Sequence, residues 1–253
     1  MFLRPDGRLL RTVAFGPGPH TVLALNGWSA AWEAWQPTFE LLSTDTRCIS
    51  FDTRGTGASQ GEPPDITLEG LVDDVFRVLD GHGVERCVLA GESLGGFVAL
   101  HAALRDPSRF EGLVLVASAP VVSPEVTGRL VAGARRDYPA TIRLFVKMCL
   151  NEPEAAPLHP WGERLFLDTA PEVAARLFEA CHGAEPALAA LTLPTVVVHG
   201  SEDLVVPPAA GEALARGIRG ARLVSLPGAG HAPTITRPEA VAEAIRSLRA
   251  PPR

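Results

Sequence analysis

The stretch from Val88 to Leu100 constrains the fold of this chain more than any other segment. It contains the pattern Gly-x-Ser-x-Gly, formed by Gly91, Ser93 and Gly95. An apolar run typical of a buried strand precedes the pattern, and an Ala- and Leu-rich run typical of a helix follows it. This context predicts a nucleophile elbow, a sharp turn that exposes the serine hydroxyl. The elbow needs glycine on both sides of the serine because a Cβ there would collide with the neighbouring strand and helix.

Strand-like and helix-like segments alternate along most of the 253 residues. Strands are predicted at residues 9–15, 21–25, 48–51, 87–90, 113–116, 195–199 and 223–226, and helices at residues 31–42, 68–79, 94–104 and 240–248. This alternation predicts an α/β fold, with a mostly parallel twisted sheet covered by helices on both faces. Hydrophobic residues make up 46% of the chain, which is enough for one such core.

The alternation is interrupted once, where the chain shows only helical patterns. Ser123 followed by Pro124 is typical of the beginning of a helix in this region. A purely helical segment between two strands of one sheet indicates an insertion. We therefore expect a helical cap at residues 121–191, inserted into a core domain formed by residues 1–120 and 192–253.

Charge and cysteine content exclude several classes of partner and site. The formal net charge is −6 and no run of five basic residues occurs, so we expect neither nucleic acid nor a membrane as partner. The four cysteines show no C-x-x-C pairing, which argues against a zinc site and against a disulfide framework. Residues 1–7 lack the pattern of a signal peptide, and no apolar run approaches a membrane span. We expect a cytoplasmic monomer or homodimer.

A serine hydroxyl becomes a useful nucleophile only when a base takes its proton and an acid orients that base. Asp203 follows a strand-like run, and His231 lies in a Gly-rich loop after the last predicted strand. Open parallel sheets gather such loops at the carboxyl edge of their strands. Glu202 is the alternative acid, one residue before Asp203.

Four segments together resemble the α/β-hydrolase fold superfamily, in its cap-bearing serine esterase or lactonase branch: Gly91–Gly95, Asp52–Ser59, His199–Asp203 and Gly230–His231. The order Ser, Asp, His along the chain is that of this superfamily. The resemblance implies Ser93 as nucleophile, His231 as base and Asp203 as acid.

Acyl transfer also needs hydrogen-bond donors for the developing oxyanion. One expected donor is the backbone N–H of Leu94, directly after the nucleophile. The resemblance implies a second donor in the backbone N–H of Trp28. The family usually has His-Gly before that position, whereas this chain has Asn26 and Gly27. Because asparagine can bond its own backbone, we expect Asn26 to keep the loop in place.

Other polar residues have structural interpretations. Asp52 and Arg54 occupy a strand-end turn that is usually a brace. His199 is expected to tie the acid loop together, whereas His159 and His182 lie in the cap and are candidates to face the substrate.

The lead hypothesis is a hydrolase that cleaves a small apolar ester or lactone through an acyl-serine, with no metal and no cofactor. Trp161, Phe145 and Tyr138 of the cap are the expected substrate-binding residues. The same triad would also suit a biosynthetic enzyme that removes an acyl group by elimination or cleaves a C–C bond. A third hypothesis is a non-catalytic receptor on the same fold.

Overall fold

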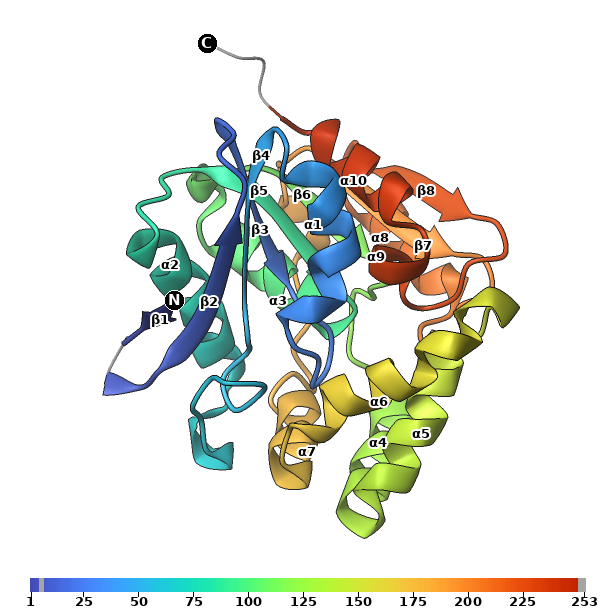
Figure 1. Cartoon of the computed structure of the whole chain (residues 1–253). Helices are drawn as coiled ribbons and strands as arrows, with labels where there is room; N and C mark the ends of the chain where they lie inside the picture. The colour runs from blue at the N-terminus through green and yellow to red at the C-terminus, as the bar shows by residue number, and fades with distance from the viewer. Residues whose placement is uncertain (5–6, 250–253) are drawn as a thin grey trace.

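The computed structural model describes residues 1–4 and 7–249, and one eight-stranded sheet forms its centre (Figure 1). The strands are β1 (Phe2–Leu3), β2 (Leu10–Phe15), β3 (His20–Leu25), β4 (Thr46–Phe51), β5 (Cys87–Glu92), β6 (Phe110–Val116), β7 (Thr195–Gly200) and β8 (Arg222–Leu226). Their spatial order is β1-β2-β4-β3-β5-β6-β7-β8. β1 and β2 pair antiparallel, as do β2 and β4, and every other neighbouring pair is parallel. The predicted fold class is confirmed.

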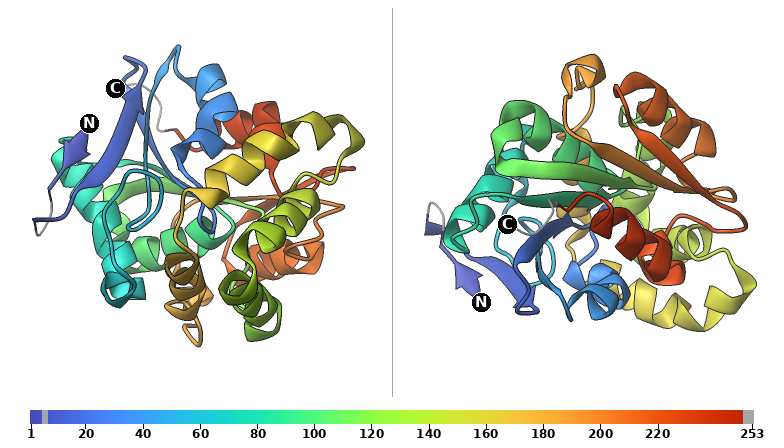
Figure 2. Two further views of the ribbon diagram at one scale, coloured as in Figure 1. Left: turned by 60° about the horizontal axis from the view of Figure 1, so that its bottom comes forward. Right: turned by 90° about the horizontal axis from the view of Figure 1, so that it is seen from above.

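Helices cover both faces of the sheet, as Figure 2 shows from above. The core helices are α1 (Gln36–Leu42), α2 (Leu68–Gly81), α3 (Leu94–Arg105), α8 (Pro208–Gly217), α9 (Pro233–Thr236) and α10 (Pro238–Arg246). α2, α3 and α8 share one apolar cluster, and α1 and α10 share the other. Each cluster meets one face of the sheet because side chains alternate along a strand. In β3, Val22 and Ala24 face the α1 side, whereas Leu23 and Leu25 face the α3 side.

Four helices lie between β6 and β7, gathered at one end of the sheet in Figure 1. They are α4 (Pro124–Arg136), α5 (Tyr138–Cys149), α6 (His159–Leu167) and α7 (Pro171–Glu179). α4 begins where the Ser-Pro pair predicts it. The Ser123 side chain makes no capping hydrogen bond to this helix. We use residues 121–191 as the bounds of the cap. Residues 250–253 of the predicted core domain lie outside the described residues, as do Pro5 and Asp6 of the N-terminal segment.

The turn after β4 braces the core. Asp52 is fully buried and accepts hydrogen bonds from the backbone N–H groups of Trp32 (3.2 Å) and Ala58 (2.9 Å). Arg54 is buried and binds both carboxylate oxygens of Asp74, at 2.7 and 2.6 Å. These contacts confirm the structural interpretation of both residues.

None of the described helices is long and apolar enough to cross a membrane.

Candidate active site

Ser93 lies in a strained turn between β5 and α3. Its φ of 54° is positive, which is uncommon for a residue with a side chain. A Cβ on Gly91 would lie 2.5 Å from the Gly95 carbonyl oxygen, and a Cβ on Gly95 would lie 2.4 Å from the Asn26 carbonyl oxygen. Only glycine fits at both positions, which is why the elbow needs the pattern seen in the sequence.

The structure brings the three predicted triad residues together from three loops. Ser93 Oγ lies 3.0 Å from His231 Nε2, and His231 Nδ1 lies 2.8 Å from Asp203 Oδ2. His231 and Asp203 are buried. Glu202, the alternative acid, is exposed, and in the described part of the chain it is Asp203 that binds the imidazole.

The Asp203 carboxylate is held by its own loop. Its Oδ1 accepts hydrogen bonds from the backbone N–H groups of Val205 and Val206, both at 2.8 Å. His199 Nε2 lies 2.9 Å from the Val206 carbonyl oxygen and 3.2 Å from Asp203 Oδ2. His199 therefore ties the acid loop to β7, as the sequence predicts.

Burial and charge act in opposite directions on this pair. Burial alone would raise the pKa of Asp203, but the charge of His231 and hydrogen bonds from His199 and His231 hold that pKa below its ordinary value. Burial lowers the pKa of His231, and attraction to Asp203 and Glu92 outweighs it, so the pKa of His231 is raised. The arrangement keeps the acid ionised and makes the histidine a stronger base.

The loop after β3 reaches Ser93 from the other side. A Cβ on Gly27 would lie 3.4 Å from Ser93 Cβ, so this loop packs directly against Ser93. The backbone N–H groups of Trp28 and Leu94 donate no hydrogen bond to any group in the described part of the chain. Asn26 Nδ2 donates to the Phe51 carbonyl oxygen of β4 at 2.7 Å. Asn26 therefore bonds the backbone of the neighbouring strand and not its own, and it fixes the loop to β4.

Glu92 is a residue that the sequence interpretation missed. It ends β5, is buried, and accepts a hydrogen bond from Thr234 Oγ1 at 2.7 Å. Burial raises the pKa of Glu92 to about 7, although Thr234 and His231 oppose the change. A carboxylic acid inside an otherwise apolar β-strand is the signal that could have found it, since such residues are seldom buried without a role.

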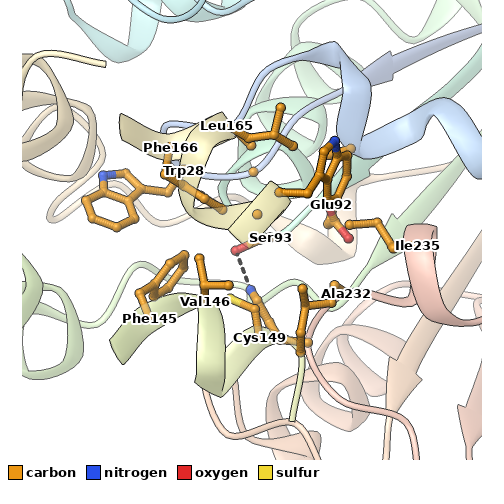
Figure 3. A pocket seen from close by; sticks show the side chains of 17 residues that line it. Trp28, Glu92, Ser93, Phe145, Val146, Cys149, Leu165, Phe166, Ala232 and Ile235 are labelled. Carbon is orange, nitrogen blue, oxygen red and sulfur yellow. Dashed lines mark hydrogen bonds between the residues drawn. The ribbon is translucent and has the colours of Figure 1, made fainter. Parts of the chain in front are cut away.

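Two apolar cavities meet at Ser93. The smaller, of about 50 Å³, also borders His231 and Glu92, and Figure 3 shows its side chains. The larger, of about 250 Å³, lies between α4, α8 and residues 119–123. Phe145 borders both cavities. Carbon atoms dominate the walls of both, so each suits an uncharged substrate group.

The cap residues expected to bind substrate divide into two groups. Trp161 lines the smaller cavity, as do Phe145 and Phe166, and Phe178 lines the larger. Tyr138 lines neither cavity. Its hydroxyl donates to the Phe166 carbonyl oxygen at 2.8 Å, so it supports the packing of α5 on α6 and the expectation for Tyr138 is wrong.

The two cap histidines are also structural. His159 Nε2 lies 2.9 Å from the Leu150 carbonyl oxygen, and His182 Nε2 lies 2.5 Å from Thr127 Oγ1. Neither borders the two cavities at Ser93. Within residues 1–4 and 7–249, no cluster of three side chains suited to hold a metal ion is present.

Comparisons with known proteins agree on one family. The model of the alpha/beta hydrolase family matches residues 22–244. A pimeloyl-(acyl-carrier protein) methyl ester esterase of Nitrosomonas europaea is 30% identical over 240 residues, which cover 88% of this chain and 93% of the relative. A hydrolase structure from Pseudomonas aeruginosa PA01 superposes with a TM-score of 0.89 at 30% identity, covering 98% of this chain and 97% of that one. An enol-lactonase structure from Burkholderia xenovorans LB400 gives a TM-score of 0.87 at 26% identity, with 98% and 99% covered.

Proposed function

We propose that this chain, which belongs to the alpha/beta hydrolase family, is a serine hydrolase that cleaves a carboxylic ester or lactone of a small apolar substrate. The observation that carries the proposal is the hydrogen-bonded line from Ser93 through His231 to Asp203, with distances of 3.0 and 2.8 Å, at the junction of two apolar cavities. Relatives named as a methyl ester esterase and an enol-lactonase support this substrate class.

The first half-reaction forms an acyl-serine. Ser93 Oγ attacks the ester carbonyl carbon while its proton passes to His231 Nε2, 3.0 Å away. The negative charge that develops on the carbonyl oxygen is stabilised by the free backbone N–H groups of Trp28 and Leu94. His231 then gives the proton to the leaving oxygen, the C–O bond breaks, and the alcohol departs.

The second half-reaction uses the same groups in reverse order. Water donates a proton to His231 Nε2 and its oxygen attacks the acyl-serine carbonyl carbon. The proton returns to Ser93 Oγ as the carboxylic acid leaves. In both halves the Asp203 carboxylate orients the ring through Nδ1, at 2.8 Å, and stabilises the imidazolium.

Residues 121–191 act as a cap in this proposal. α5 and α6 supply Phe145, Trp161 and Phe166 to the wall of the smaller cavity. A wall built partly from an insertion restricts access to the nucleophile, which favours small substrates over polymers. The four free, buried cysteines support a location in the reducing cytoplasm.

Replacement of the nucleophile tests the proposal. Ser93→Ala should lower turnover of p-nitrophenyl acetate by several orders of magnitude and abolish labelling by a fluorophosphonate probe, with an unchanged circular dichroism spectrum. Ser108→Ala, which alters an exposed serine after α3, is the matched control and should label like the wild type. Residual turnover within about tenfold of the wild type would refute the assignment of Ser93.

A further inference from the structure

The two cavities differ in which part of the triad they border. His231 lines the smaller cavity together with Ala232, the residue that follows it. In the described part of the chain, the larger cavity is bordered by Ser93 and Leu94 on the triad side and does not reach His231. The two sides of Ser93 are therefore chemically different.

Chemistry fixes which half of an ester belongs on each side. The leaving oxygen must take its proton from His231 Nε2, so it must come within hydrogen-bond distance of that atom. The alcohol's carbon chain is attached to this oxygen and extends into the space that His231 borders. The acyl chain leaves the carbonyl carbon in the other direction, toward the larger cavity.

The volumes then limit each half. One water-sized group needs about 10–15 Å³, so the cavity of about 50 Å³ beside His231 holds about three to five such groups, the leaving oxygen included. The cavity on the acyl side, at about 250 Å³, is five times as large as the 50 Å³ beside His231. A short alcohol therefore fits where a long one does not, whereas several acyl carbons have room.

Phe145 borders both spaces. Its ring stands edge-on to Trp28, with centroids 5.0 Å apart, and edge-on to Phe166 at 5.3 Å. It is 3% exposed, so the ring is held by packing on several sides. The ring is therefore a fixed part of the wall of both spaces.

We propose that the substrates of this chain are esters of a one- to three-carbon alcohol with a longer apolar acyl chain, the alcohol lying beside His231 and the acyl chain beside Leu94. This assignment rests on the proposed function, because it assumes that Ser93 and His231 carry out acyl transfer. It defines the substrate class of that same site by the sizes of the alcohol and of the acyl chain.

Two isomeric esters provide the test. Methyl hexanoate and pentyl acetate contain the same atoms and differ only in the position of the carbonyl group. With the purified full chain in a proton-release assay, we expect kcat/KM for methyl hexanoate to exceed that for pentyl acetate by tenfold or more, because each methylene that does not fit costs about tenfold or more. Equal values, or a preference for pentyl acetate, would overturn the proposal.

Two variants test which cavity holds the alcohol and which holds the acyl chain. Ala34→Val narrows the cavity beside His231 and should lower the propyl-to-methyl ratio of hexanoate esters at least fivefold, with little change in the hexanoate-to-acetate ratio of methyl esters. Ala210→Phe narrows the larger cavity and should instead lower the hexanoate-to-acetate ratio of methyl esters. If Ala34→Val lowers the hexanoate-to-acetate ratio and Ala210→Phe lowers the propyl-to-methyl ratio, the assignment of the cavities is overturned. Melting temperatures check that both variants fold.

Failure of the proposal and failure of the proposed function give different results. If Ser93→Ala keeps the turnover of both isomers, the serine mechanism itself is wrong. If Ser93→Ala abolishes both and the wild type prefers pentyl acetate, the serine mechanism stands and only the placement of the two halves is wrong.

Discussion

Glu92→Gln should make the stability of this chain less dependent on pH. The Glu92 carboxyl lies at the end of β5, 6% exposed, and accepts one hydrogen bond from Thr234. Burial raises its pKa from an ordinary 4.5 to about 7, partly offset by the Thr234 hydroxyl and the charge of His231. Glutamine keeps the shape and can accept the same hydrogen bond, but it cannot ionise.

The magnitude follows from the difference between the folded and unfolded pKa. A pKa change of one corresponds to about 1.4 kcal/mol, so ionising Glu92 costs about 3 kcal/mol more in the folded chain than in the unfolded one. Between pH 4.5 and about 7 the unfolded chain has lost this proton and the folded chain retains it. Glu92 therefore makes the free energy of unfolding fall as the pH rises through this range, and the loss is complete above about pH 7.

Urea unfolding followed by tryptophan fluorescence measures the effect. We expect the free energy of unfolding of Glu92→Gln, relative to that of the wild type, to increase by about 3 kcal/mol between about pH 4.5 and pH 8. Glu243→Gln, which alters an exposed glutamate of α10, is the control and should show no such growth. His231 and Asp203 face Glu92, so the comparison is repeated in a His231→Asn background. A difference between wild type and Glu92→Gln that stays constant across this range in both backgrounds would refute the reasoning.

Three further results are expected. kcat/KM should rise with pH through one ionisation above pH 6.5, because His231 must be neutral to act as base and Asp203 raises the pKa of His231 against the effect of burial. A flat profile of kcat/KM from about pH 5 to 8 would contradict this. Trp161→Ala should increase the rate on butyl esters relative to methyl esters by about tenfold or more, and an unchanged ratio would show that this side chain does not limit the cavity beside His231. Arg54→Met should lower the free energy of unfolding by about 3 kcal/mol, because the buried Asp74 carboxylate loses both hydrogen bonds from Arg54 and keeps the partly exposed Arg77 at 3.3 Å. Urea unfolding that shows a loss of less than about 1 kcal/mol would contradict the brace.

The hydrogen-bonded arrangement of Ser93, His231 and Asp203 could be predicted from sequence because each of the three lies in a local pattern that fixes its own backbone. Gly91 and Gly95 are required by contacts within the elbow and with the adjacent loop, so they mark Ser93 without knowledge of distant packing. Asp203 and His231 follow β7 and β8, and parallel strands bring such loops to one edge.

Residues whose role depends on distant partners could not be predicted in the same way. Asn26 finds its acceptor on β4, and Tyr138 finds its acceptor on α6. α8 begins at Pro208, the second of two consecutive prolines, in a segment rich in small residues where no strong apolar period marks a helix. The apolar pattern of Trp161 and Phe145 predicts burial in a helix, but only the three-dimensional packing shows which cavity each side chain borders.

The end of α5 links the cap to the triad. Three hydrogen bonds join residues 149–152 to the loops of the acid and the base: from His231 N to Cys149 O (3.1 Å), from Asn151 Nδ2 to Glu202 O (2.9 Å) and from Gly230 N to Glu152 Oε1 (3.0 Å). The same helix carries Phe145, which borders both cavities. A movement of α5 that widens either cavity must therefore also pull on the loops that hold His231 and Asp203. Since triad geometry tolerates only small displacements, the insertion has to be as rigid as the core that it covers.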